Sequence, residues 1–128
     1  MKRKKTKTNR PKLPHITEEM KQWSAMLGQE LSGWSHAKSR PMFGLLAFYR
    51  KAKIFAGLPV TRGIKSPNSV IFKINPMPSD LLRRAIQDPR IDTDSALPGT
   101  RWYAFEVNSA DDLRDALWWL NQAYERAK

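Results

Sequence analysis

The sequence predicts an α+β domain in which a single antiparallel sheet forms one layer and helices packed on one of its faces form the second. Residues 42–49 and 53–58 are rich in Phe, Tyr, Ile and Leu, which suit the pleated, half-buried surface of a strand. Amphipathic helical patterns precede this hairpin and close the chain. Strands joined by short turns and flanked by helices are typical of two-layer α+β domains.

The size and composition are those of one soluble domain. The chain has 128 residues, of which 41% are hydrophobic, enough for a single core. It contains no cysteine, which excludes disulfides, thiolate metal sites and cysteine nucleophiles and fits a reducing compartment. No apolar run approaches the roughly 20 residues that span a bilayer, and no apolar segment follows the charged start. We therefore expect a cytoplasmic protein without a membrane partner.

Positive charge is concentrated at the N-terminus. The formal net charge is +11, and residues 1–15 contain seven cations and no acidic residue. These cations are Lys2, Arg3, Lys4, Lys5, Lys7, Arg10 and Lys12. Residues 16–128 hold the other 16 Lys and Arg residues together with all 12 Asp and Glu, a net charge of +4. We therefore divide the chain into a basic, disordered N-terminal arm, residues 1–15, and one domain, residues 16–128.

The arm allows two interpretations. As a functional element, it is an electrostatic arm that contacts DNA, RNA or ribosomal RNA. Alternatively, it is a solvated tail that aids solubility, or it results from a translation start assigned too far upstream. The density of cations favours contact with a polyanion.

The first helix is predicted to run from Thr17, a good N-cap, to about Gly33. Glu18 and Glu19 lie in its first turn, where negative charge is favourable. Apolar residues recur at spacings of 3 and 4 and predict one buried face: Met20, Trp23, Leu27, Leu31 and Trp34. Core packing accounts for this face.

The sheet is predicted to continue beyond the hairpin. Residues 35–40 before it form a polar link, and residues 59–68 after it form a loop with Gly and Pro breakers. Alternating apolar residues predict two further strands, over residues 69–75 and 102–108. In the first of these strands, one face is expected to carry Val70, Phe72 and Ile74 and the other Ile71 and Lys73. In the second, one face is expected to carry Tyr103, Phe105 and Val107 and the other Trp102, Ala104 and Glu106.

A short helix and a loop separate these two strands. Ser79 is the expected N-cap of the helix. Its expected apolar face is Leu81, Leu82, Ala85 and Ile86. Residues 88–89, Asp-Pro, end the helix, and residues 90–100 are predicted to be an exposed loop. One more strand has room either in residues 35–41 or in residues 91–97.

The last helix opens at Ser109, with Asp111 and Asp112 in a near capping box. Its buried stripe is predicted to be Leu113, Ala116, Leu117, Leu120 and Tyr124, with Trp119 at the margin. Trp118 falls far from the centre of this stripe at about 100° per residue. It is either exposed to a partner, such as a second subunit or a ligand, or buried beneath residues 90–100.

Catalytic and metal-binding motifs are weak. His15 and His36 lie in no ligand motif, and Asp92 and Asp94 lack the glycine and glutamate of a calcium-binding loop. Matches to the nucleophile-elbow and phosphate-loop patterns fail at required positions. Because no nucleophile, base and orienting group can be assembled, we expect a non-enzymatic protein with no metal and no cofactor.

Five further cations surround the central hairpin and its following loop: Arg50, Lys51, Lys53, Arg62 and Lys65. If they lie on one side of the domain, they extend the positive field of the arm. Neither an exposed aromatic sheet face nor a helix-turn-helix is recognisable, so we expect contacts with the phosphate backbone and no reading of base sequence.

Short motifs around the hairpin carry a family resemblance. MFG at residues 42–44, FYR at residues 48–50 and KIFA at residues 53–56 resemble the opening of TfoX N-terminal-like and MmcQ/YjbR-like domains. Leu45 stands where those domains usually have a second glycine. The sequence therefore departs from the family pattern at the position where a glycine would let another group approach the backbone of this turn closely.

The C-terminal part is similar to small bacterial proteins of the luciferase-domain, or luciferase-family, group, a label that does not itself imply light emission. The matching positions are Trp102 to Phe105, Asp112-Leu113, Ala116-Leu117 and Ala123-Tyr124. Over residues 17–127, these resemblances imply a two-layer domain with the secretion-chaperone-like order α-β-β-β-α-β-β-α. They imply DNA-related regulation for some members and carry over no catalytic residue.

Taken from the residues and the resemblance, the expected function is that of a small non-enzymatic module that binds nucleic acid through its basic arm, with a homodimer as a further expectation. The alternative is a protein- or small-ligand-binding domain. Its pocket would lie between sheet and helices and be lined by aromatics such as Phe48, Phe55 and Trp102.

Overall fold

The fold is centred on one antiparallel sheet of six strands in the order β1-β2-β3-β4-β6-β5. The structure, a computed structural model, describes residues 15–64, 66–93 and 101–128. The elements are α1 (Glu18–Ser32), β1 (Ala37–Met42), β2 (Leu45–Arg50), β3 (Lys53–Pro59), β4 (Ser69–Lys73), α2 (Ser79–Ile86), β5 (Ile91–Asp92), β6 (Trp102–Glu106), the short 3-10 helix η2 (Ala110–Asp112) and α3 (Leu113–Arg126). The predicted α+β class is confirmed.

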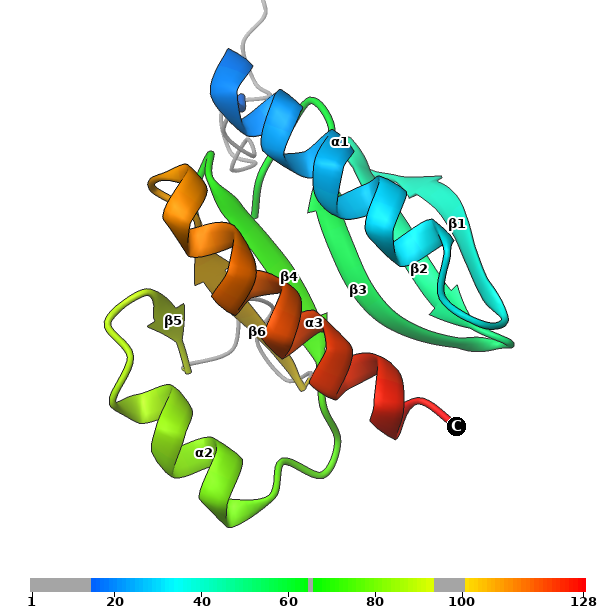
Figure 1. Cartoon of the computed structure of the whole chain (residues 1–128), viewed down its shortest axis with the longest axis vertical. Helices are drawn as coiled ribbons and strands as arrows, with labels where there is room; N and C mark the ends of the chain where they lie inside the picture. The colour runs from blue at the N-terminus through cyan, green and yellow to red at the C-terminus, as the bar shows by residue number, and fades with distance from the viewer. Residues whose placement is uncertain (1–14, 65, 94–100) are drawn as a thin grey trace, which may run out of the picture.

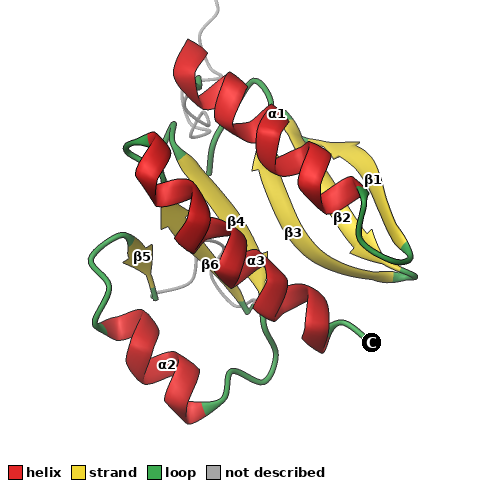
Figure 2. Cartoon of the chain, viewed as in Figure 1, coloured by secondary structure: helices red, strands yellow, loops and turns green. Residues whose placement is uncertain are grey.

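The helices are not distributed evenly around the sheet. Helices α1 and α3 contact each other and lie on the same face of the sheet (Figure 1). Helix α2 packs near β5, at the edge of the sheet opposite to β1, which α1 contacts (Figure 2). The core therefore lies between the sheet and the α1–α3 pair.

Helix α1 forms as its pattern predicts. The hydroxyl of Thr17 accepts a hydrogen bond from the backbone N–H of Met20 at 3.1 Å, so the predicted N-cap is present. Gly33 is the C-cap. On the predicted stripe, Met20, Leu27 and Leu31 are buried.

Residues 35–40, expected to be a polar link, mostly belong to an edge strand instead. Strand β1 pairs with β2 from Ala37 opposite Arg50 to Met42 opposite Leu45. Its middle residues are all exposed, so it lacks the alternation of apolar and polar residues that reveals a strand in sequence. This strand gives four before α2, one more than the family resemblance implies.

A tight turn joins β1 to β2 at Phe43 and Gly44. Both residues have positive φ, 53° and 84°, as a two-residue hairpin turn of the favoured hand requires. The Gly44 carbonyl also accepts hydrogen bonds from the N–H groups of Val60, Thr61 and Arg62 at 2.9, 2.9 and 3.2 Å. Gly44 therefore fixes the β1–β2 hairpin onto the chain that leaves β3.

The substitution Gly44→Ala is expected to lower the free energy of unfolding by about 1–3 kcal/mol. A Cβ there would lie 2.7 Å from Cγ of Arg62, on a residue whose φ is already unfavourable for alanine. Gly33→Ala is the matched control, because its nearest neighbour would be 3.5 Å away and its φ is −85°. Urea unfolding of both variants checks this, and equal effects would contradict it.

The two faces of the sheet are both apolar but unequal. The predicted alternation in β4 and β6 is confirmed: Val70, Phe72, Phe105 and Val107 join the large core beneath α1 and α3. The opposite face carries a smaller buried cluster of Leu45, Ile64, Ile71, Trp102 and Ala104.

Helix α2 departs from its prediction at both ends. Its N-cap is Pro78, without a side-chain hydrogen bond, and Ser79 is already the first helical residue. Ile86, expected on the apolar face, is 64% exposed, because the buried contacts of this eight-residue helix come from Leu81 and Ala85. The additional strand expected in residues 91–97 is present as β5, and residues 94–97 lie outside the described residues.

Helix α3 begins after a true capping box. The Ser109 side chain accepts from the backbone of Asp112, and the Asp112 carboxylate accepts from the backbone N–H of Ser109. Trp119, placed at the margin of the stripe by the sequence, is 2% exposed and stacks on Phe72 with ring centroids 5.5 Å apart. It is a central core residue.

Candidate nucleic-acid interface

The arm joins the domain beside Arg62. The backbone N–H of Ile16 donates to the carbonyl of Thr61 at 3.2 Å, and His15 forms an antiparallel bridge with Arg62. The seven arm cations and Lys65 lie outside the described residues. Four of the twelve predicted contact residues are therefore placed by the structure: Arg50, Lys51, Lys53 and Arg62.

These four cations occupy opposite ends of the β2–β3 hairpin. Arg50 pairs with Lys53 across the turn that contains Lys51. Arg62 instead follows the far end of β3, where its N–H donates to Gly44. The structure thus brings three of the predicted cations together and separates them from Arg62.

Arg50 has a structural role. Its Nη1 donates to the backbone carbonyl of Tyr124 at 3.0 Å, and its guanidinium lies 4.3 Å from the centroid of the Tyr124 ring. A cation at the last turn of α3 also complements the negative end of the helix dipole. Arg50 therefore holds the C-terminal end of α3 against the hairpin.

A basic pocket lies where β3 begins and β4 ends. Its volume is about 400 Å³, and Lys53, Lys73 and Arg126 contribute its charge. No carboxylate is found among the described residues that line it, which also include Asn75 and Ala123. Sequence reasoning identified Lys53 but missed Lys73 and Arg126, because one ends a strand and the other ends a helix 53 residues later in the chain.

A second pocket lies between α2 and α3. Its volume is about 510 Å³, and its described lining is Asp80, Leu81, Arg83, Arg84, Gln87, Trp118, Gln122 and Arg126. Arg126 lines both pockets, and its Nη1 donates to Oε1 of Gln122 at 2.9 Å. We call Lys53, Lys73, Arg83, Arg84, Arg126 and Trp118 the Arg126 surface. Asp80 is the one carboxylate among the described lining residues of the two pockets.

Trp118 is covered by α2, which neither interpretation of the sequence anticipated. The guanidinium carbon of Arg84 lies 4.1 Å from its ring centroid. The edge of Trp119 meets it at 5.0 Å and 89°. Trp118 remains half-buried and faces the α2–α3 pocket.

The aromatic residues proposed for a ligand pocket do not share one. Phe48 and Phe55 are 1% and 0% exposed in the large core, and Trp102 lies in the cluster on the opposite face of the sheet. A groove of about 560 Å³ does lie beside α1, but its described lining contains no aromatic residue and consists of small and aliphatic residues together with Lys21 and Gln29.

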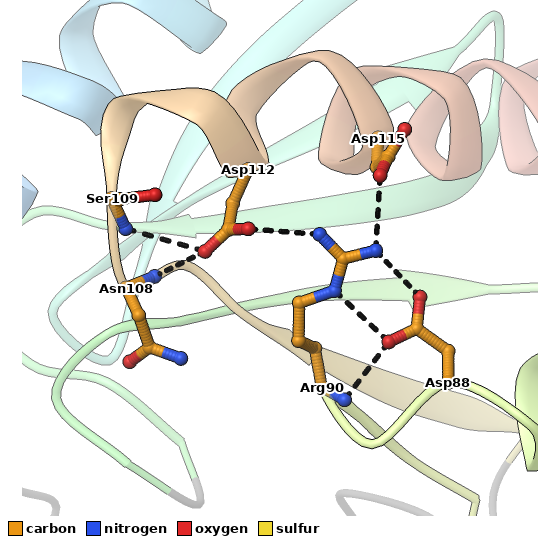
Figure 3. A network of polar contacts seen from close by, with 6 residues as sticks. All are labelled: Asp88, Arg90, Asn108, Ser109, Asp112 and Asp115. Atoms are coloured by element: carbon orange, nitrogen blue, oxygen red, sulfur yellow. Dashed lines mark hydrogen bonds and ion pairs between the residues drawn. The ribbon is translucent and has the colours of Figure 1, made fainter.

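A separate polar network surrounds Arg90 (Figure 3). Its guanidinium donates to both oxygens of Asp88 at 2.9 and 2.8 Å, to Asp112 at 2.8 Å and to Asp115 at 3.0 Å. It also lies 4.7 Å from the centroid of the Phe105 ring. These contacts join the segment before β5 to the start of α3, and we call them the Arg90 clamp.

The clamp changes the acidity of its members. The hydrogen bond with Asp88 raises the pKa of Arg90, and the same bond lowers the pKa of Asp88 below its usual range. Burial raises the pKa of Asp112, but hydrogen bonds from the Asn108 backbone N–H and from Arg90 outweigh it, so that pKa is also lowered. All three groups stay charged at neutral pH, which suits a structural clamp and not proton transfer.

The described part of the chain contains neither a metal-binding cluster nor a membrane-spanning helix. It has no group of three or more His, Cys, Asp or Glu side chains placed to hold a metal ion. None of its helices is both long enough and apolar enough to cross a bilayer.

Comparison with known proteins adds no relative. No protein-family model, no curated protein and no solved structure matches this chain. The resemblance to TfoX N-terminal-like, MmcQ/YjbR-like and luciferase-family domains therefore stays a prediction from sequence, as does a homodimer.

Proposed function

We propose that this chain is a non-enzymatic module that binds nucleic acid through phosphate contacts made by its N-terminal arm and its Arg126 surface. The observation that carries the proposal is the gathering of five cations around two adjoining pockets with Asp80 as the one described carboxylate. Lys and Arg side chains bind phosphate oxygens without reading the bases.

The placement of the acidic residues supports the proposal. Asp88, Asp112 and Asp115 are bound to Arg90 at the start of α3, whereas Arg126 lies in the last turn of the same helix. With Arg90 these three carboxylates keep a net charge of −2. A polyanion is therefore expected to approach the Arg126 surface from the C-terminal end of α3 and not from the clamp.

The arm joins the domain beside Arg62, after the end of β3, and Lys53 begins that strand. Seven residues of strand span about 20 Å, so the point where the arm joins the domain lies about that far from Lys53.

Binding is expected to depend steeply on salt. In a fluorescence-anisotropy titration, seven arm cations in contact with phosphates give a slope of log K against log salt of about −6 for a labelled 20-base-pair duplex and of about −5 for the single strand. Deleting residues 1–15 removes that contribution. The double variant Lys73→Gln/Arg126→Gln reduces the slope by about 2 more.

The matched control is Lys38→Gln/Arg40→Gln, which removes two exposed cations from β1, a strand that lines neither pocket. It is expected to alter the slope less than the Lys73/Arg126 pair. A flat salt dependence, or full binding after deletion of residues 1–15 in the Lys73/Arg126 variant, would refute the proposal.

A further inference from the structure

Trp118 is the one aromatic residue of the Arg126 surface, and it packs at the margin of the large core. It lies outside the stripe of α3 that packs on the sheet, which consists of Ala116, Trp119, Leu120, Ala123 and Tyr124. Its ring lines the α2–α3 pocket and stays half-buried. A large aromatic side chain on the outer flank of a helix is a common anchor for a binding partner.

The side chain that covers Trp118 is itself suited to stacking. Arg84 lies on exposed helix α2 with its guanidinium carbon 4.1 Å from the Trp118 ring centroid. Nucleic-acid bases stack both on aromatic rings and on the plane of an Arg guanidinium. A base can therefore stack in two ways: on the guanidinium of Arg84, or directly on the Trp118 ring after it displaces Arg84.

Apart from the Asp80 carboxylate, the remaining polar lining residues complement a nucleotide. The pocket of about 510 Å³ falls in the size range of small-ligand sites. Gln87 and Gln122 supply amide groups that can hydrogen-bond to a base edge. Arg83 and Arg126 supply positive charge for the flanking phosphates.

From these contacts we infer that the α2–α3 pocket binds an unpaired base of single-stranded nucleic acid, stacked on the Arg84–Trp118 pair. The inference rests on the proposed function and narrows its ligand class. In a duplex the faces of each interior base are covered by its neighbours, so this contact is open to a single strand and closed to a duplex. Phosphate contacts alone would not distinguish the two.

The test compares a labelled 20-nucleotide strand, as DNA and as RNA, with the blunt duplex of the same sequence. Trp118→Leu is expected to weaken single-strand binding by about 5- to 150-fold, the range of one lost base–aromatic stack. Duplex affinity is expected to change less than twofold, and the salt slope of both ligands to stay the same. DNA and RNA strands that respond alike indicate that the base alone is recognised, and a larger effect on one of them assigns the pocket to that nucleic acid.

Arg84→Lys provides a second variant that keeps the charge but removes the planar guanidinium. It is expected to weaken single-strand binding without changing the salt slope. Trp23→Leu is the matched control, because Trp23 is a half-buried tryptophan of α1 that lines neither pocket. Thermal unfolding identifies any variant that fails to fold, in which case Arg84→Lys decides.

The outcomes separate this inference from the proposed function. If both variants bind single strands and duplex as the wild type does, stacking in the pocket is refuted while phosphate binding stands. Equal losses for both ligands also refute it. If the wild type binds neither ligand, the proposed function and the inference fail together.

Discussion

Replacing Arg90 with alanine is expected to lower the free energy of unfolding by about 3 kcal/mol. The substitution leaves Asp88 and Asp112, whose side chains are 17% and 16% exposed, without the guanidinium that offsets their desolvation. Removing one partner of a buried charge pair typically costs about 3–5 kcal/mol, and the water that still reaches these carboxylates favours the lower end. Urea unfolding at neutral pH measures the change.

Asp115→Asn is the control within the same clamp. Its side chain is 52% exposed, so its ion pair with Arg90 is screened by solvent and contributes about 0–1 kcal/mol. If Arg90→Ala destabilised the protein no more than Asp115→Asn, the clamp would be a surface feature without a structural role.

The clamp also predicts how stability changes in acid. The pKa values of Asp88 and Asp112 are lower in the folded protein than their usual 3.8, so the unfolded chain takes up protons first as the pH falls. The contribution of these two carboxylates to the free energy of unfolding is full above about pH 5. It is lost as the pH falls through 3.8 toward the lower pKa values of the folded protein. In Arg90→Ala the free energy of unfolding should decline less steeply as the pH falls, because the hydrogen bonds from Arg90 that lower the two pKa values are absent.

Phe55→Ala is expected to cost about 3–5 kcal/mol, the usual range for removing a buried phenylalanine. Phe55 is fully buried and packs against both Trp34 and Tyr124, with ring centroids 6.3 and 5.5 Å away. The cavity would remove a contact from both rings, of which Trp34 follows α1 and Tyr124 belongs to α3. Thermal and urea unfolding measure the loss.

Phe43→Ala removes the same side chain from a turn where it is 79% exposed. Its effect should remain within about 0.5 kcal/mol, because the side chain is exposed and the positive φ of this residue is unfavourable for phenylalanine and alanine alike. A loss below 1 kcal/mol for Phe55→Ala would show that the core tolerates a space there, and would restore the ligand-pocket interpretation of this residue.

The sequence predicted best the elements that are rich in buried apolar residues. Strands β4 and β6 are of this kind, because one face meets the helices and the other meets the smaller cluster. For residues 35–41 the sequence left both a polar link and an additional strand open, because an edge strand with exposed Lys38, Ser39 and Arg40 has no apolar face to reveal it. Proline is tolerated at position 41 of such a strand, at an edge where no neighbour needs its N–H.

The polar sites were harder to predict because their members converge from distant positions. Arg90 meets one carboxylate 2 residues away and two others 22 and 25 residues away. The Arg126 surface likewise joins a strand start, a strand end and two helices. Each residue looks like an ordinary solvated charge in sequence, and only the fold shows that they share a site.

The strand order also has a consequence for a chain made from its N-terminus. Strands β1 to β4 each pair with the strand before or after them, so a four-stranded meander can form as soon as β4 has emerged. Strand β5 cannot join at that stage, since β6, the strand with which it pairs, comes later, as do the Asp112 and Asp115 carboxylates that hold neighbouring Arg90 (Figure 1). The contacts described for the second half of the domain, from α2 onward, are therefore complete only when the last helix has left the ribosome.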